Sequence, residues 1–279
     1  MPRACVLLRH SASYRADAFR NGLKRHGFTI EEKWLRHPEP DDLVLLWNRT
    51  RAFEPVAEAY ERRNAGVLIA ENGFLGPADN ARKMYALAWN HHNGCGAWHV
   101  GDKPRREFAT EPWRTRDGHI LLLPQRGIGE KGVAMPQTWL VDIQKRLRAV
   151  TDRPIRVRRH PGADRSDPWP DLKAAYCAVT WGSGAGLKAI CHGVPVFHEL
   201  KKWIGSPAAK FGIAEIDNCV RPDRGPMLHR ISWAQWDAEE IESGKAFEYL
   251  LWHRSSSISR QATPDRNLSG KPCRLASTG

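Results

Sequence analysis

The sequence predicts an α/β protein with two parallel sheets and flanking helices, one sheet in each half of the chain. Short apolar segments alternate with amphipathic segments of helical length, which is the pattern of βαβ units. A charged stretch at residues 102–117, with Pro104 and Pro112, interrupts this alternation and is the expected linker. The alternation then starts again. We therefore predict two Rossmann-like domains that face a cleft, where ligands bind at the carboxyl ends of the strands.

The first domain is expected to cover residues 1–110. Strands are placed where apolar residues cluster over four to seven positions, and helices where apolar residues recur every three or four positions. The expected strands are residues 5–10, 28–34, 43–48 and 66–72, and the expected helices are residues 14–26, 53–64 and 78–89.

The second domain is expected to cover residues 118–254. Its expected strands are residues 119–124, 155–159, 178–181 and 194–197, and its expected helices are residues 136–150, 187–191 and 232–253. Gly193 is expected to end the second of these helices as a C-cap. Residues 255–279 are rich in Ser, Arg, Pro and Gly, so we predict a flexible basic tail.

Composition restricts the class of protein. The net charge of +12 favours an anionic partner, which could be nucleic acid, an acidic glycan, an anionic lipid or a nucleotide. No apolar run has the length of a membrane span, so no integral membrane association is expected. The six cysteines are scattered without a Cys-x-x-Cys pair, which is typical of free thiols in the cytoplasm. The histidines lack a recognised ligand spacing, so neither a metal nor another cofactor is expected.

A Gly/Ser turn follows the expected strand at residues 178–181 and opens a helix. It consists of Ser183, Gly184, Ala185 and Gly186. A helix N-terminus offers free N–H groups and the positive end of the helix dipole, and glycines let a phosphate approach closely. We therefore expect this turn to bind the phosphates of a nucleotide. The alternative is a turn that serves packing alone.

Basic residues follow two other strands of the same half. Arg126 and Gly127 come after the strand at residues 119–124, and Arg158 and His160 come at the end of the strand at residues 155–159. Carboxyl ends of parallel strands meet at one edge of a sheet, so these four residues are expected to bind the same donor. Strand alternation is expected to turn either Arg158 or Arg159 into the cleft. For His160 the alternative is a hydrogen bond to backbone.

The first half contributes candidates for acid–base chemistry. Glu71 ends the strand at residues 66–72, and a Gly-rich loop carries His91, His92 and Asn93. We predict Glu71 and His92 as the catalytic candidates, since either can accept a proton from an acceptor hydroxyl. Asn72, His91 and Asn93 are expected on the acceptor side. The alternatives are a carboxylate that caps the following turn and a plain surface loop.

These segments, in this order, resemble bacterial capsule-polysaccharide glycosyltransferases, the group that includes the Kdo transferases. The resemblance covers residues 66–215 and rests on residues 71–75, Pro124 with Gln125, residues 158–161, and residues 183–196. It implies a GT-B fold, a nucleotide sugar bound mainly by the second domain, and no metal requirement. Asn72 stands where those enzymes carry Asp, so the base would move to Glu71 or the chemistry would differ. Residues 91–96 and 232–244 also look like segments of small phage transferases.

The expected function is transfer of a sugar from a nucleotide sugar to a hydroxyl on a polymer. Charge, size and the phage-like segments narrowly favour hydroxymethylated pyrimidines in double-stranded phage DNA as the acceptor. The first alternative is a transferase that builds a bacterial surface or capsule glycan. The second is a non-catalytic protein that binds a nucleotide or nucleic acid, which the Asn at position 72 would explain.

Overall fold

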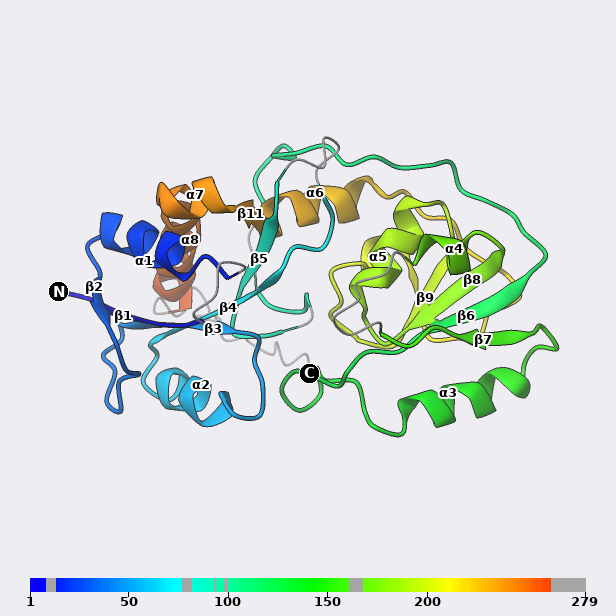
Figure 1. Ribbon diagram of the computed structural model, residues 1–279, viewed down its shortest axis with the longest axis horizontal. Helices are drawn as coiled ribbons and strands as arrows, with labels where there is room; N and C mark the ends of the chain where they lie inside the picture. Colours follow the sequence, from blue (N-terminus) through cyan, green and yellow to red (C-terminus); the bar gives the residue numbers. More distant parts are fainter. Residues whose placement is uncertain (9–13, 77–81, 93, 98–99, 161–167, 262–279) are drawn as a thin grey trace, which may run out of the picture.

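The computed structural model describes residues 1–8, 14–76, 82–92, 94–97, 100–160 and 168–261, which form two lobes side by side (Figure 1). Each lobe holds one β-sheet with helices on both faces, so the predicted fold class is confirmed. In the described residues no helix has the length and hydrophobicity required to cross a bilayer.

The first sheet has the strand order β11-β5-β4-β3-β1-β2. Its strands are β1 (Arg3–Leu7), β2 (Thr29–Glu31), β3 (Leu43–Trp47), β4 (Gly66–Asn72), β5 (Met84–Trp89) and β11 (Gln235–Asp237). The first four strands run parallel. At one edge β5 pairs antiparallel with β4, and β11 pairs antiparallel with β5. α2 (Glu54–Glu61) covers one face through Val56 and Tyr60, while α1 (Ala16–Arg25) covers the other through Phe19 and Leu23.

The second sheet has the order β10-β9-β8-β6-β7, with all its strands parallel. The strands are β6 (His119–Leu123), β7 (Ile155–Val157), β8 (Ala175–Thr180), β9 (Val196–His198) and β10 (Lys210–Phe211). α3 (Trp139–Arg148) packs on one face, and α4 (Trp169–Leu172) and α5 (Gly184–Cys191) pack on the other. The strand order reverses between β6 and β8, which is where ligands bind in open parallel sheets.

The prediction of a helix at residues 78–89 is wrong where the structure describes this range. Met84–Trp89 forms β5, which lies antiparallel to β4. Both of its faces are covered, so Tyr85 and Leu87 are as buried as Ala86 between them, and the segment has no polar face to mark its period. Residues 77–81 lie outside the described residues.

The prediction of one helix over residues 232–253 is also wrong. The chain forms α6 (Gly225–Ala234), then β11, α7 (Ala238–Glu242) and α8 (Lys245–Gln261). Asp237 and Glu240 form a capping box that starts α7. Gly244 adopts a φ of +85° between α7 and α8, which ends one helix and turns the chain into the next.

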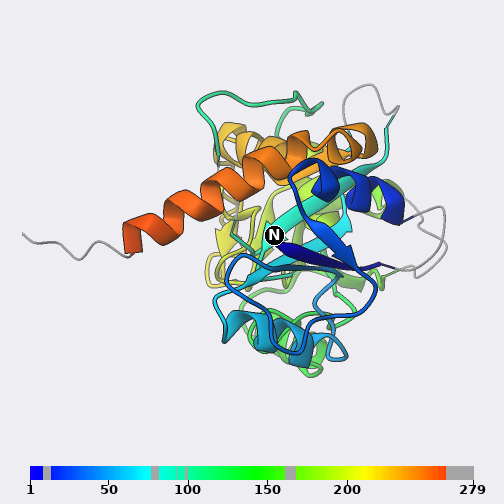
Figure 2. The same ribbon diagram turned by 90° about the vertical axis from the view of Figure 1, so that its left-hand side faces the viewer.

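This C-terminal segment belongs to the first lobe, whereas the expected second domain ran to residue 254. β11 pairs with β5, and α7 and α8 pack on α1. The physical reason is the apolar side of α8, where Phe247 and Leu250 complete the core on the α1 face. α8 crosses this lobe and its end projects beyond it (Figure 2). It includes residues 255–261 of the expected tail, and residues 262–279 lie outside the described residues.

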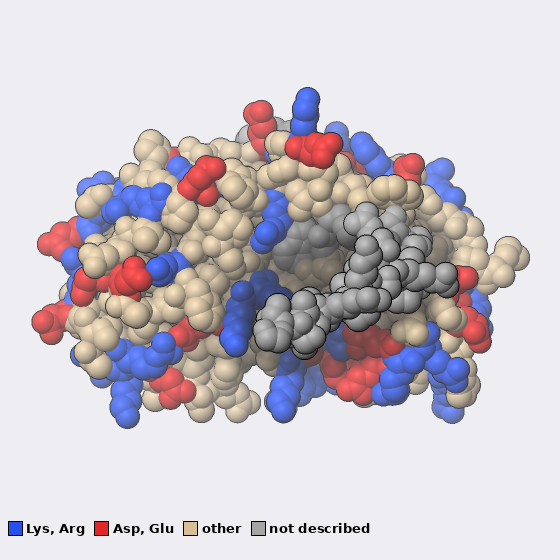
Figure 3. Space-filling model, turned by 180° about the vertical axis from the view of Figure 1, so that it is seen from behind, with Lys and Arg blue, Asp and Glu red and all other residues tan. Residues whose placement is uncertain are grey.

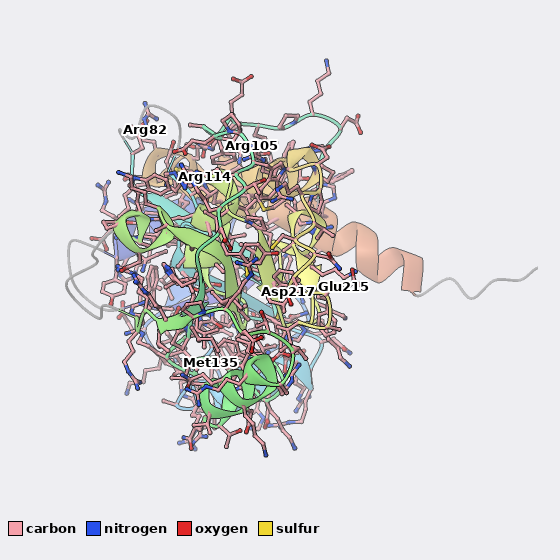
Figure 4. The ribbon with its side chains drawn as sticks, turned by 90° about the vertical axis from the view of Figure 1, so that its right-hand side faces the viewer. Arg82, Arg105, Arg114, Met135, Glu215 and Asp217 are labelled. Carbon is pink, nitrogen blue, oxygen red and sulfur yellow. The ribbon has the colours of Figure 1, made fainter. Side chains whose placement is uncertain are left out.

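Between residues 100 and 118 the described chain contains no helix or strand and runs from the first lobe to the far side of the second (Figure 1). Arg105 and Arg106 fasten its beginning to Glu240 through ion pairs. The Arg105 guanidinium also lies 3.5 Å from the centre of the Trp236 ring. This is the segment expected as a linker, and Figure 4 shows Arg105 and Arg114 along it.

Candidate active site

The Gly/Ser turn is built around the end of β8. The Thr180 hydroxyl donates to the Leu123 carbonyl at 3.0 Å and accepts from the Ser183 N–H at 3.0 Å. Ser183 is the N-cap of α5, and its Oγ accepts from the Ala185 N–H at 3.1 Å. Among the described residues, the Gly184 N–H has no hydrogen-bond partner. One N–H group of the turn is therefore available for an anion while the cap is intact.

The two glycines of this turn have different surroundings. A Cβ built on Gly184 would meet nothing within 4 Å, so this side of the turn is open. A Cβ on Gly186 would lie 3.1 Å from Thr180 Cγ2 and 3.1 Å from the Trp203 ring. Gly186 thus serves packing, and Gly184 is the position at which a ligand can approach the backbone.

The loop after β6 lies beside this turn. The Gln125 side-chain amide donates to the Gly182 carbonyl at 3.3 Å, which joins the carboxyl ends of β6 and β8. The Gln125 backbone N–H contacts Met135 Sδ at 3.1 Å, and Met135 lies just above α3 in Figure 4. Gly127 has a φ of +67°, and a Cβ there would lie 3.2 Å from the Met135 carbonyl oxygen. The loop therefore folds back on itself at the point where the strand order reverses.

The structure brings together two of the three predicted basic side chains. The pKa of His160 is lowered, first by its partial burial and then by the positive charge of Arg126. Arg158 instead makes an ion pair with Asp171 of α4. Arg126 consequently supplies the positive charge on this side of the candidate site, and that charge favours the neutral imidazole of His160. Arg158 is held by a neighbouring helix.

Glu71 and His92 also come together. In the described part of the chain the buried His92 Nδ1 has no hydrogen-bond partner, and it lies 3.5 Å from Glu71 Oε2. Their side chains are 5% and 17% exposed, respectively. Asn72 follows Glu71 on β4 and so points to the opposite face of the sheet. Asn93 lies outside the described residues. The geometry provides one carboxylate–imidazole pair that can accept a proton.

The turn after Glu71 is fixed by a residue from the far end of the chain. Buried Gln235 accepts from the Phe74 N–H at 2.9 Å and the Leu75 N–H at 3.2 Å, and it donates to the Leu75 carbonyl at 2.7 Å. A Cβ on Gly73 would lie 2.4 Å from Met84 Cβ, so this position requires glycine. Sequence reasoning missed Gln235, because only β11 pairing brings it to this turn.

Arg49 holds the start of the loop at residues 90–97, which we call the histidine loop. This buried guanidinium donates to the Asn90 carbonyl at 2.6 Å and makes ion pairs with Glu54 at 2.7 Å and Glu61 at 2.6 Å. Burial lowers the pKa of Arg49, but the two carboxylates outweigh it and hold that pKa above its usual value. Asn90 adopts a φ of +69°, immediately before His91. The available sequence signal was an arginine directly after an apolar strand.

Side chains from the two lobes contact each other at the candidate site. His91 Nδ1 lies 2.7 Å from Oε1 of Glu130, which belongs to the loop after β6. Burial raises the pKa of the Cys95 thiol to about 12, with further contributions from the charges of Glu130 and Glu71. Both carboxylates therefore lie near Cys95, one from each lobe.

A short segment after β9 links the two parts of the site. The Ile204 N–H donates to the Gly94 carbonyl at 2.8 Å, next to the histidine loop. The neighbouring Trp203 ring packs against Gly186 of the Gly/Ser turn and against Gly182 just before it. On the face seen in Figure 3, Lys and Arg side chains gather in the middle of the molecule, where the lobes meet. Among the described residues, no three His, Cys, Asp or Glu side chains form a metal-binding group.

These features define a two-lobed α/β protein with a candidate site at the boundary between the lobes. Its fold is similar to the KpsC β-Kdo 2,4 transferase of Thermosulfurimonas dismutans, with a TM-score of 0.50 and 13% identity over 84% of this chain and 91% of that one. The β-Kdo 2,7 transferase of the same KpsC follows, with a TM-score of 0.47 and 13% identity over 88% of this chain and 99% of that one. The resemblance that the motifs predicted is confirmed for the fold. No protein-family model and no curated protein matches the chain.

Proposed function

We propose that this chain is a glycosyltransferase that moves a sugar from a nucleotide sugar to a hydroxyl of a glycan. The observation that carries the proposal is the arrangement across the lobe boundary. The Glu71–His92 pair comes from one lobe, the turn at Gly184 comes from the other, and the 203–204 segment touches both sides. The likeness in fold to a Kdo transferase supports the same class of reaction.

In the proposed reaction, Glu71 accepts the proton of the acceptor hydroxyl, either directly or through His92. The acceptor oxygen then bonds to the anomeric carbon, and the bond from that carbon to the phosphate oxygen breaks. The departing nucleotide keeps the electron pair, so negative charge grows on its phosphate. The Gly184 N–H, Arg126 and His160 are the groups that would stabilise this charge, without a metal ion.

The proposal also specifies the acceptor of the sugar. We propose a glycan first, because the solved structure with a similar fold is a β-Kdo 2,4 transferase. The net charge of +12 makes hydroxymethylated DNA the second candidate. The deciding assay measures nucleotide release from a panel of nucleotide sugars with glycan acceptors, hydroxymethylated DNA, ordinary DNA or no acceptor. Release stimulated only by hydroxymethylated DNA would select the second candidate. If no donor gives any release, the chain is better explained as a non-catalytic protein that binds a nucleotide or nucleic acid.

Gly184→Ala tests the phosphate turn. We expect the Kd for a nucleoside diphosphate to rise about 10- to 100-fold, because the new methyl group blocks a hydrogen bond to a charged group. The fold should be preserved, since a Cβ there has open space and Ala favours a helix more than Gly. Calorimetric titration measures the affinity, and thermal unfolding checks the stability.

Two variants complete this experiment. Gly225→Ala changes the first residue of another helix, α6, and should leave nucleotide affinity unchanged. Ser183→Asp keeps a good N-cap for α5 but places a negative charge in the turn, so it should abolish binding. Unchanged affinity in both Gly184→Ala and Ser183→Asp would mean that phosphates do not bind at this turn.

A further inference from the structure

Two consecutive histidines contact carboxylates from different lobes. His92 lies beside Glu71, at the end of β4 in its own lobe. His91 lies beside Glu130, in the loop between β6 and α3 of the other lobe. The two contacts are therefore separated by a single peptide bond along the chain.

Glu130 is held by few contacts. Its side chain is 9% exposed, and its Oε2 atom is buried without a hydrogen-bond partner among the described residues. Its Oε1 atom meets His91 Nδ1 at 2.7 Å. A buried carboxylate with one partner strongly favours keeping that partner, since an unpaired charge away from water is costly.

The loop that carries Glu130 also carries the candidate donor-binding residues Arg126 and Gly127. A tight turn fixes Glu130 within this loop, because its carbonyl accepts from the Val133 N–H at 3.1 Å and the Ala134 N–H at 2.9 Å. The position of the loop after β6 therefore determines where the Glu130 carboxylate meets the histidine loop.

We propose that Glu130 is a positioning residue that couples the donor loop to the Glu71–His92 pair. With the loop in place, Glu130 orients His91, and the His91–His92 peptide then holds the His92 imidazole toward Glu71. The present distance of 3.5 Å from His92 Nδ1 to Glu71 Oε2 leaves room for this contact to tighten. The expected effect of this coupling on turnover rests on the proposed function. The structural coupling between Glu130 and the histidine loop does not.

Hydrogen exchange of the full-length protein tests the coupling without any substrate. In Glu130→Ala, amides of residues 90–97 should exchange about 3- to 30-fold faster than in the wild type. They include the Cys95 N–H, which donates to the His92 carbonyl at 3.2 Å. The matched control is Glu111→Ala, which removes a similar carboxylate from His192, 2.8 Å away at the end of α5, and should leave this loop unchanged.

If Glu130→Ala does not fold, His91→Ala removes the same contact through the other partner, whose side chain is 46% exposed and so easier to replace. It should give the same faster exchange. Unchanged exchange at residues 90–97 in a folded variant would overturn the coupling.

Turnover distinguishes positioning from a direct role. With any donor that the wild type uses, Glu130→Ala should lower kcat about 10- to 100-fold and leave the KM for the donor within about threefold. Glu130→Gln can still accept a hydrogen bond from His91 and should recover most of kcat. Equal losses in both variants would mean that Glu130 touches the reacting atoms instead. If the wild type releases no nucleotide from any donor, the proposed function fails while the exchange experiment still decides the coupling.

Discussion

Replacing Glu71 with Gln is expected to lower kcat by about 10²- to 10⁴-fold, the usual contribution of a general base. Gln has nearly the same shape as Glu but cannot accept the proton of the acceptor hydroxyl. The donor affinity should not change, because the candidate phosphate contacts come from the other lobe, at the turn around Gly184. Steady-state kinetics give kcat, and calorimetric titration with the donor gives the affinity.

Asn72→Asp is the informative companion to this variant. Asn72 stands where the resembling transferases carry Asp, yet strand alternation points it to the face opposite Glu71. We expect the added carboxylate to leave kcat unchanged within about threefold, since it lies away from His92. A large gain in Asn72→Asp together with a tolerated Glu71→Gln would place the base at position 72 and contradict our assignment.

Replacing Arg49 with Met is expected to reduce the free energy of unfolding by about 1–3 kcal/mol, because its charged hydrogen bonds are lost while Glu54 and Glu61, which are 30% and 35% exposed, can be hydrated. Arg49 is buried among Glu54, Glu61 and the Asn90 carbonyl, so its loss leaves two carboxylates and one carbonyl without their donor. Met retains much of the volume, which keeps the packing contribution small. Urea denaturation followed by circular dichroism measures the change.

An exposed ion pair provides the control for this experiment. Arg62 is 68% exposed and lies 3.3 Å from Glu58 on α2, so Arg62→Met should cost less than about 1 kcal/mol. Adding Glu54→Gln and Glu61→Gln to Arg49→Met should restore part of the stability, because it removes the two unpaired charges. An Arg49→Met protein as stable as Arg62→Met would show that the cluster contributes little.

The elements predicted correctly are those whose signals are local. The turn from Thr180 to Gly186 and the helix after it follow from adjacent residues, and Ser183 caps that helix through its neighbour Ala185. β11 is only three residues long and exists because β5 offers it an edge, so no local pattern marks it. The capping box at Asp237 and Glu240 is a local signal for a new helix start inside the range predicted as one helix.

The residues of the candidate site differ in the same way in whether local sequence can predict them. Glu71 could be singled out because it lies at the end of a predicted strand, and His92 because it lies in a Gly-rich loop. Their pairing could not be predicted, since it depends on β5 lying beside β4 where a helix was predicted. The pairing of Arg158 with Asp171 could not, since it depends on where α4 packs. Glu130 and Gln235 matter only through contacts with residues far away in the sequence. Such partners are fixed by tertiary packing, which a single sequence does not specify.

The return of the chain to its first sheet has a consequence for synthesis on the ribosome. The second sheet is complete at residue 211 and its core at Ala234 of α6, so this lobe can fold while the remainder is still being made. The first lobe has to wait for residues 235–261, and until then β5 presents an unpaired edge. Open edges of this kind are where nascent chains associate wrongly. The part of the protein that is made first is therefore the part that matures last.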